Sequence, residues 1–579
     1  MSKLLFNKIK RSLSFGGRVE RKYQDINPED IFLDSTNLPG FDSTMLEGRI
    51  ERPMGSTTFA SVKVVLCIIV LIMMGKLWSL SILDGPVYAE ISDNNRLEQT
   101  LVFANRGLIT DRNGLELAGN AIKSGENDFP RRLYVPINGL AHVVGYVKYP
   151  LVDKAGIYYE KEYRAKDGVE RAYDAELKGK SGKKLVETDV LGAVTSESVI
   201  DKPEDGETIT LSIDARVNEV LYNAIKSLAL DNGFVGGAAV IMDVNTGELL
   251  ALTSYPEYDQ NALTRGMDQA SFNRLLNDKR KVFLNRAVGG LYTPGSIIKP
   301  ILALGALEEN IISPEKEILS TGSITVPNPY DPEKPSIFKD WKAHGWTDMR
   351  EALAVSSDTY FYSIGGGFGN QKGLGISLID KYLKQFSVAE TTGIELGGEV
   401  EGLIPTPEWK AATFGGDIWR LGDTYITAIG QYGTQITPLS AARFIGAVAN
   451  KGKILKPSLL KGGLAEPIQS TVTFDPEDWR VVHEGMREGV TYGTSVGLNV
   501  LYVKAAGKTG TAEVGSGKTY VHSWSVGFFP YENPRYAWAV VMERGMATNT
   551  VGATYIMRQL FDWISVNAPE YFKEVALGP

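Results

Sequence analysis

The segment GGLYTPGSIIKPILALGALEEN, residues 289–310, carries the pattern on which both the fold and the chemistry depend. Pro294 and Gly295 indicate a turn, and the apolar run after them predicts a helix that starts near Ser296. On such a helix Ser296 and Lys299 lie on one face, because they are three residues apart. A serine hydroxyl is a weak nucleophile until a base takes its proton, and a lysine does so only where its pKa is lowered toward neutrality. The segment therefore predicts a serine nucleophile with a lysine base. The alternative is an N-cap serine beside a surface lysine.

A second motif, Ser356-Ser357-Asp358, lies within ALAVSSDTYFY. The hydroxyl of Ser356 is suited to relay a proton between Lys299 and a leaving group, and the side-chain carbonyl of Asp358 is suited to hold a substrate amide. The alternative interpretation is a polar loop between two helices.

A third motif, Lys508-Thr509-Gly510-Thr511, lies within VKAAGKTGTAEV. On a strand, Lys508 and Gly510 share one face, and Thr509 and Thr511 share the other. Glycine leaves the strand edge open to a ligand, and the lysine and threonine side chains suit a substrate carboxylate. A phosphate-binding loop is excluded, because that pattern requires glycine where this chain has Tyr502.

The segments around the motifs predict an α/β (α+β) sandwich, an antiparallel sheet with helices on both sides. Strand-like runs lie before and after the motifs, and helical spacing lies between and after them. The strand-like runs are 236–256, 522–530 and 535–544, and the helical ones are 297–310, 347–367 and 554–566. Asn245-Thr246-Gly247 indicates a tight hairpin. The sheet is therefore expected to pair early strands with late ones.

One stretch near the N-terminus, FASVKVVLCIIVLIMMGKLWSLSIL at 59–83, is apolar enough to cross a membrane, which takes about 20 residues. A buried core helix is the alternative, but no neighbouring segment is suited to cover it on all sides. A cleaved signal peptide is disfavoured, because no small-residue cleavage site follows. Basic residues precede the stretch and acidic ones follow it. This bias predicts a cytoplasmic N-terminus, with the bulk of the chain on the extracytoplasmic (periplasmic) side of the inner membrane.

The expected organisation has five parts. A mostly disordered cytoplasmic tail precedes the single transmembrane helix, and an elongated β-rich module and a large catalytic domain follow it. The boundaries are 1–58, 59–83, 84–205 and 206–567, with a C-terminal tail at 568–579.

Composition excludes several other functions. The net charge of −8 is spread along the chain and argues against nucleic acid, which requires a basic face. Cys67 is the one cysteine, so the chain forms no internal disulfide. With four histidines in addition, a structural zinc site is not expected.

The order Ser-x-x-Lys, Ser-x-Asn/Asp, Lys-Thr-Gly is typical of penicillin-interacting serine enzymes, and the spacings of about 60 and 150 residues suit a large transpeptidase. Over residues 60–565 the chain resembles class B penicillin-binding proteins. ANRGLITDRNGLELAGN and GVERAYDAELKGKSG resemble the family's pedestal motifs, so the module at 84–205 is expected to be a pedestal of the dimerisation type. WRLGDTYITAIGQYGTQITPLSAA and Asp358 resemble the elongation-type branch, penicillin-binding protein 2, more than the division-type branch.

The resemblance implies a D,D-transpeptidase that acts on peptidoglycan stem peptides and is acylated by β-lactams. The implied catalytic residues are Ser296, Lys299, Ser356, Asp358 and Lys508, and the implied substrate-binding residues are Thr509, Gly510 and Thr511. The backbone N–H groups of Ser296 and Thr511 match the family's oxyanion hole.

The resemblance implies no cofactor. Some elongation-type relatives bind zinc just before the second motif, through acidic residues, a histidine and a cysteine. Asp340 and His344 match that pattern in part, but Leu353 occupies the cysteine position, so no metal is expected. His344 is then interpreted as a hydrogen-bonded loop histidine.

The resemblance implies a SEDS-type glycan polymerase and other cell-elongation proteins as partners. A separate polymerase is also expected because residues 84–205 are too short for a glycosyltransferase domain. Three alternatives to an elongation enzyme remain open. They are a division-type class B transpeptidase, a membrane-anchored β-lactamase and a membrane penicillin sensor.

Overall fold

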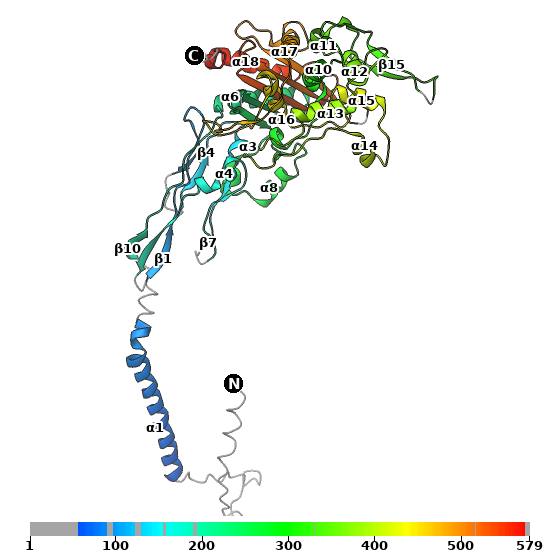
Figure 1. The fold of residues 1–579 in the computed structure, drawn as a ribbon. Coiled ribbons are helices and arrows are strands. Elements are labelled where there is room, and N and C mark those ends of the chain that lie inside the picture. Colours follow the sequence, from blue (N-terminus) through cyan, green and yellow to red (C-terminus); the bar gives the residue numbers. More distant parts are fainter. Residues whose placement is uncertain are drawn as a thin grey trace, which may run out of the picture. The chain divides into compact units, whose positions relative to one another are not determined.

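The computed structural model describes residues 56–89, 97–121, 129–154, 158–188, 194–328, 331–515 and 517–573. The chain divides into two compact units, residues 1–95 and 96–579, and each is described by itself (Figure 1). The disordered tail predicted at 1–58 lies outside the described residues except for 56–58.

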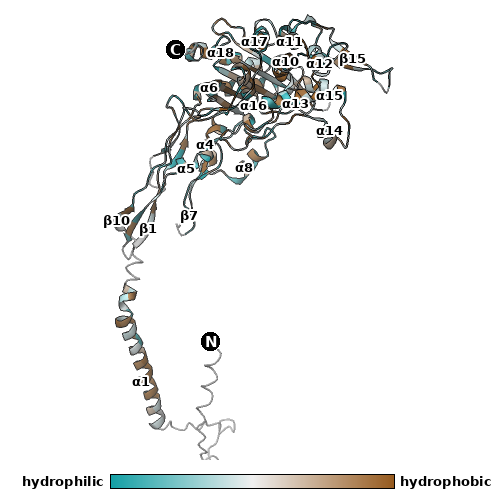
Figure 2. Ribbon diagram, in the orientation of Figure 1, coloured by the Kyte–Doolittle hydropathy of each residue, from teal (hydrophilic) through white to brown (hydrophobic). Residues whose placement is uncertain are grey.

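The first unit contains an apolar helix, α1 (Ser56–Trp78), which continues as a π-helical turn (Ser79–Leu83). Figure 2 shows α1 coloured largely as hydrophobic. Within the described residues, Phe59–Leu83 is the one helical stretch long and apolar enough to cross a membrane, with a mean hydropathy of 2.3. These bounds match the predicted span, and the helix fits a single-pass membrane protein. The π-helical turn was not predicted from the sequence.

The centre of the second unit is a five-stranded antiparallel sheet in the order β13-β12-β22-β21-β20. The early hairpin, β12 (Gly236–Asp243) and β13 (Leu249–Tyr255), lies beside the late strands β20 (Ala506–Val514), β21 (Tyr520–Phe529) and β22 (Tyr536–Met546). The prediction that early and late strands share one sheet is confirmed. The third motif therefore lies on the edge strand β20.

Helices cover both faces of this sheet, as predicted. On one face, Ala239 and Ile241 of β12 pack in the same core as α6 (Ala215–Asn232) and α18 (Ala553–Asn567). On the other face, Val240 packs in a core with α10 (Lys299–Glu308), α16 (Pro438–Ala449) and α17 (Pro476–Thr491). Alternate residues of a strand point to opposite faces, so one fully apolar strand serves both cores.

Further elements surround this core. The helices are α7 (Gln260–Arg265), α8 (Gln269–Leu276), α9 (Arg286–Gly289), α11 (Met349–Ala354), α12 (Asp358–Gly366), α13 (Gly375–Gln385), α14 (Pro407–Thr413) and α15 (Leu421–Ala428). The strands are β14 (Ile318–Ser320), β15 (Ser323–Val326), β16 (Ser336–Lys339), β17 (Gly345–Thr347), β18 (Lys453–Leu455) and β19 (Ile468–Thr471). The 3-10 turn after α18, Pro569–Tyr571, lies in the expected C-terminal tail, yet Tyr571 is buried and its hydroxyl donates to Asp214 Oδ2 at 2.7 Å.

The region predicted as a β-rich module contains small sheets and, in addition, short helices. One sheet has the order β1-β9-β10 (Leu97–Val102, Gly182–Thr188, Val194–Asp201) and another has the order β11-β2-β3-β4 (Ile209–Thr210, Ile109–Thr110, Glu116–Ala121, Arg131–Tyr134). Two hairpins pair β5 with β8 (Val147–Lys148, Arg164–Ala165) and β6 with β7 (Leu151–Val152, Tyr158–Glu160). The helices are α3 (Ala141–Val144), α4 (Gly168–Ala172) and α5 (Asp174–Leu177). Because β11 follows residue 205 and pairs with β2, the predicted domain boundary there stays a prediction.

A buried ion cluster joins the two sequence motifs of this region. The carboxylate of Glu170, on α4, accepts from Arg106 Nε at 2.5 Å and from Arg132 Nε at 2.7 Å, and the Tyr134 hydroxyl donates to it at 3.1 Å. The side chains of Glu170 and both arginines are fully buried. Burial alone would raise the pKa of Glu170, but the two guanidinium groups lower it below its usual range. Glu170 thus pairs with both arginines, and Asp174 Oδ1, 2.7 Å from Arg106, supplies a second negative charge.

We predict that Glu170→Ala lowers the free energy of unfolding by about 3–5 kcal/mol, because it leaves the buried guanidinium of Arg132 without its counter-ion and that of Arg106 with Asp174 alone. Denaturant titration of the detergent-solubilised protein measures the change. The control is Glu204→Ala, which removes an exposed ion pair with Lys180 and should leave stability nearly unchanged. Equal effects of the two substitutions would contradict the account of this cluster.

Candidate active site

Ser296 lies on a short 3-10 turn, Gly295–Ile298, directly before α10. In this geometry residues three apart stand above one another, so Ser296 and Lys299 face the same side, as predicted. Gly295 has a φ of +59°, which glycine adopts at little cost. Its N–H donates to the Gly430 carbonyl at 2.9 Å, which ties the turn to the segment before α16.

The second motif forms the connection between α11 and α12, and Asp358 is the first residue of α12. Ser357 caps α12, where its side chain accepts from the Tyr360 N–H at 3.3 Å. Ser356 has a φ of +60°, a left-handed conformation that is uncommon for a residue with a β-carbon. The loop thereby turns the Ser356 hydroxyl toward the two lysines of the other motifs.

Lys299 is fully buried. Its ammonium group donates hydrogen bonds to two residues of the second motif, Ser356 and Asp358. Nζ donates to the Ser356 carbonyl at 2.9 Å, to Ser356 Oγ at 3.4 Å and to Asp358 Oδ1 at 2.6 Å. The ring of Phe361 lies beneath the ammonium, 5.0 Å from Nζ to the ring centroid. Asp358 therefore neutralises Lys299 in this structure. The sequence predicted that Asp358 holds a substrate amide. In the structure its Oδ1 accepts from Lys299, and the residue also lines the cleft.

Lys508 approaches the same hydroxyl from β20. Its Nζ donates to Ser356 Oγ at 2.7 Å and to the Thr509 carbonyl at 2.9 Å, and the side chain is fully buried. Burial, and next the positive charge of Lys299, lower the pKa of Lys508 well below its ordinary value. The sequence suggested that Lys508 contacts a substrate carboxylate. In the structure the ammonium is directed at Ser356 instead.

The other residues of the third motif alternate as predicted. Lys508 and Gly510 are buried, Thr509 is half-buried and Thr511 is exposed. Gly510 lines the cleft and also has a packing role. A β-carbon there would lie 2.5 Å from the Pro294 carbonyl oxygen, so Gly510 lets β20 pack against the turn that carries Ser296. The Thr509 hydroxyl donates to Thr494 Oγ1 at 2.7 Å.

A cleft of about 590 Å³ brings residues of all three motifs together. Of the predicted site residues, it is lined by Ser296, Ser356, Asp358, Thr509, Gly510 and Thr511. Lys299 and Lys508 lie beneath its surface and reach it through the Ser356 hydroxyl. The sequence did not identify other lining residues, which belong to no short motif: Trp341, Thr494, Ser523, Trp524, Thr550, Gly552 and Thr554.

The residues considered for zinc form a buried polar cluster. The imidazole of His344 is almost fully buried, with Nε2 3.5 Å from Asp340 Oδ1, and its backbone N–H donates to the Ser320 carbonyl at 3.2 Å. Burial lowers the pKa of His344. Leu353 is buried among apolar residues and supplies no ligand. Across the described part of the chain, no group of three or more His, Cys, Asp or Glu side chains is arranged to hold a metal.

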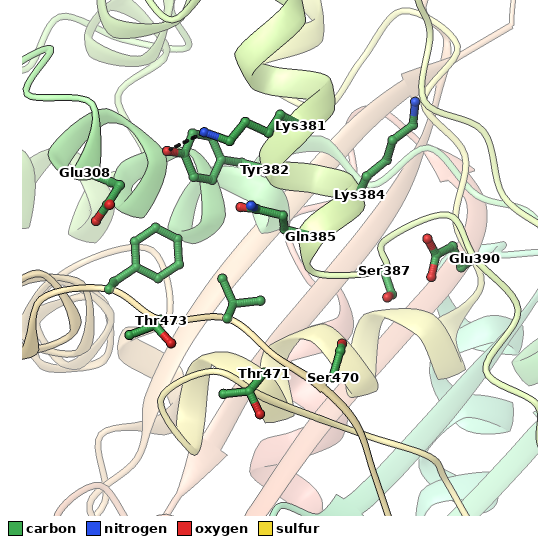
Figure 3. A pocket seen from close by; sticks show the side chains of 12 residues that line it. Glu308, Lys381, Tyr382, Lys384, Gln385, Ser387, Glu390, Ser470, Thr471 and Thr473 are labelled. Carbon is green, nitrogen blue, oxygen red and sulfur yellow. Dashed lines mark hydrogen bonds between the residues drawn. The ribbon is translucent and has the colours of Figure 1, made fainter.

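A second cavity, of about 470 Å³, contains none of the predicted site residues (Figure 3). Hydroxyl and charged side chains line it, among them Lys381, Glu390 and Thr471. Lys381 Nζ lies 3.4 Å from the Tyr382 hydroxyl and 2.8 Å from Glu309 Oε1. Because the three motifs meet elsewhere, we place the candidate active site in the Ser296 cleft.

Comparison with known proteins agrees with this placement. Residues 237–562 match the family model of the penicillin-binding protein transpeptidase domain, and residues 127–211 match that of the penicillin-binding protein dimerisation domain. The peptidoglycan D,D-transpeptidase MrdA of Haemophilus influenzae is 30% identical, over 75% of this chain and 69% of that protein.

Solved structures give the same family. Pseudomonas aeruginosa PBP2 in complex with WCK 5153 is 30% identical with a TM-score of 0.67, over 83% of this chain and all of that one. A chain of a peptidoglycan synthase complex, described as structural coordination of polymerization and crosslinking, is 25% identical with a TM-score of 0.68. That match spans 91% of this chain and 100% of the other. The protein therefore belongs to the penicillin-binding protein transpeptidase family, as a class B member of the elongation type.

Proposed function

We propose that this protein cross-links peptidoglycan stem peptides by serine acyl transfer during cell-wall elongation, with Ser296 as the nucleophile that penicillin also acylates. The convergence of two buried lysines on one serine hydroxyl, beside the cleft that Ser296 lines, carries the proposal. Membership of the elongation-type family supports the substrate class.

In the first half-reaction, Ser296 Oγ attacks the carbonyl carbon of the D-Ala-D-Ala bond. The hydroxyl proton passes to the Lys299 amine, and the carbonyl oxygen becomes an oxyanion held by the N–H groups of Ser296 and Thr511. When the C–N bond breaks, the Ser356 hydroxyl relays a proton to the departing D-alanine amine. Ser356 is placed for this relay because Lys299 and Lys508 both lie within hydrogen-bonding reach of its oxygen.

In the second half-reaction, an amine of another stem peptide attacks the acyl-enzyme. The same groups then act in reverse, and Ser296 recovers its proton as the new amide forms. Burial, and next the positive charge of Lys299, lower the pKa of Lys508, so a second ammonium group beside Lys299 is disfavoured. The hydroxyls of Thr509 and Thr511, which face the cleft, are proposed to bind the substrate's terminal carboxylate.

Replacing the proposed nucleophile and base tests these roles. Ser296→Ala should abolish covalent labelling by fluorescent penicillin, because the attacking oxygen is gone. Lys299→Ala should slow labelling by about 10²–10⁴-fold, the usual contribution of a general base. Stopped-flow or gel-based labelling measures both.

The matched control for these variants is Ser227→Ala, which removes an exposed serine hydroxyl of α6 and should label at the wild-type rate. Labelling of Ser296→Ala at a different serine would refute the nucleophile. Loss of the label within seconds, rather than hours, would favour a β-lactamase.

A pH measurement tests the environment of Lys508. Because its pKa in the folded protein is below 10.5, the unfolded chain binds more protons between these two values. The free energy of unfolding therefore rises with pH in that window. Lys508→Met should remove this contribution, so its stability should rise less steeply with pH than that of the wild type. Denaturant titrations from about pH 7 to 10 measure the difference.

The control substitution is Lys279→Met, at an exposed lysine after α8, which should follow the wild-type pH dependence. Parallel curves for Lys508→Met and the wild type would show that Lys508 is not perturbed as described.

We further propose that α1 is a single transmembrane anchor with a cytoplasmic N-terminus, and that it contacts a SEDS-type glycan polymerase. The helix is fully unburied within its own unit. A β-carbon at Gly75 would meet no atom within 4 Å, so another helix can approach closely there. Serine hydroxyls can also hydrogen-bond across such an interface; the Ser79 hydroxyl donates to Asp84 at 3.2 Å, which leaves Ser81 for that contact. The similarity to a chain of a peptidoglycan synthase complex supports the pairing.

Replacing residues 60–82 with an unrelated single-pass helix should preserve penicillin labelling but reduce co-purification with the polymerase. Gly75→Ile should reduce it as well, because its side chain blocks close approach, whereas Val70→Ile serves as the matched control. Unchanged co-purification and unchanged stimulation of polymerase activity, even with the 84–205 module also disrupted, would refute the partnership.

A further inference from the structure

The left-handed conformation of Ser356 requires support from its surroundings. A positive φ at a residue with a β-carbon is disfavoured and persists only where neighbouring contacts impose it. The conformation is also what places Ser356 Oγ within 2.7 Å of Lys508 and 3.4 Å of Lys299. The groups that fix the residues on either side of Ser356 therefore control the geometry of the relay.

On the C-terminal side, the fixing group is the carboxylate of Asp340. Its Oδ2 accepts from Ser357 Oγ at 3.0 Å and from the Thr359 N–H at 2.9 Å, as well as from Ser320 Oγ at 3.2 Å. The Asp340 side chain is fully buried. Ser357 is the N-cap residue of α12 and Thr359 lies in its first turn, so Asp340 holds the start of that helix.

On the N-terminal side of Ser356, the residue that follows Asp340, Trp341, fixes the position of Val355. Trp341 Nε1 donates to the Val355 carbonyl at 3.2 Å, and the Trp341 N–H donates to Asp340 Oδ1 at 2.9 Å. Both carboxylate oxygens of Asp340 are thus engaged, one with α12 and one with the residue that holds Val355. Trp341 also lines the active-site cleft.

We propose that Asp340 is a positioning residue for the acyl-transfer reaction. Together with Trp341, it clamps the residues on both sides of Ser356 and holds the Ser356 hydroxyl between Lys299 and Lys508. The inference rests on the proposed function, because its effect is seen only through acylation of Ser296.

The charge state of Asp340 fits this role. Burial alone would raise its pKa, but the N–H groups of Thr359 and Asp358, and then the charge of Lys299, lower it below the usual range. The group stays a carboxylate, which offers only acceptor oxygens to the donors around it. Other charged or titratable groups on the elements packed against Asp340 include His344, whose Nε2 is 3.5 Å from Oδ1.

The test is Asp340→Asn, which keeps the size of the side chain but places an NH₂ group against an N–H or hydroxyl donor. Single-turnover labelling with fluorescent penicillin separates two effects: misfolding lowers the amplitude, and loss of positioning lowers the rate constant per labelled site. We expect the rate constant to fall at least about tenfold, part of the 10²–10⁴-fold contribution of a positioned proton-transfer group, and the pH profile of the rate to shift. The matched control is Ser320→Ala. It removes a hydroxyl that donates to Asp340 Oδ2 but lies outside the second motif. It should label within about twofold of the wild-type rate.

A rate constant and pH profile of Asp340→Asn equal to those of Ser320→Ala would overturn the inference. If Asp340→Asn gives no folded protein, Ser357→Ala decides: a slow rate constant that Ser357→Thr restores supports the clamp, and a wild-type rate contradicts it. Failure of the proposed function has a different signature, because Ser296→Ala would then label normally.

Discussion

Two buried lysine side chains, Lys299 and Lys508, meet at the hydroxyl of Ser356, with the carboxylate of Asp358 as the counter-ion of the first. Burying two ammonium groups this close is unfavourable unless each is hydrogen-bonded and one charge is neutralised or lost. Helix α10, strand β20 and the turn between α11 and α12 must therefore converge within a few ångströms. The rest of the catalytic domain serves to hold these three segments in that arrangement.

Glycine makes this convergence possible. Gly295 turns the chain before Ser296. Gly430 lies so close to this turn that a β-carbon at position 430 would collide with the Gly295 carbonyl oxygen. Gly510 lets β20 approach the Pro294 carbonyl on the other side. The turn that carries Ser296 is thus enclosed by backbone from segments more than 100 residues away in the sequence. Close backbone packing gives a rigid position to a side chain that itself has to remain accessible to substrate.

Local patterns predicted most of the elements and not the pairing of side chains between them. Periodicity and composition, which depend on a few neighbouring residues, predicted three kinds of element. These are the strands β12 and β22, the helix after Ser296 and the apolar span at 59–83. The partner of Asp358, the direction of the Lys508 ammonium and the clamp made by Asp340 depend on segments brought together by folding. The sequence marked Asp340 only as part of an incomplete zinc pattern and did not identify Trp341, so only the folded structure reveals their contacts with the second motif.

The most direct test of the account is to identify the residue that carries the acyl group. The protein is incubated with a synthetic stem pentapeptide that ends in D-Ala-D-Ala, quenched and digested, and the adduct is located by mass spectrometry. The account predicts an adduct of the pentapeptide minus one D-alanine on the peptide that contains Ser296, with one D-alanine released per site. An adduct on another residue, or release of D-alanine without any adduct, would contradict serine acyl transfer at Ser296.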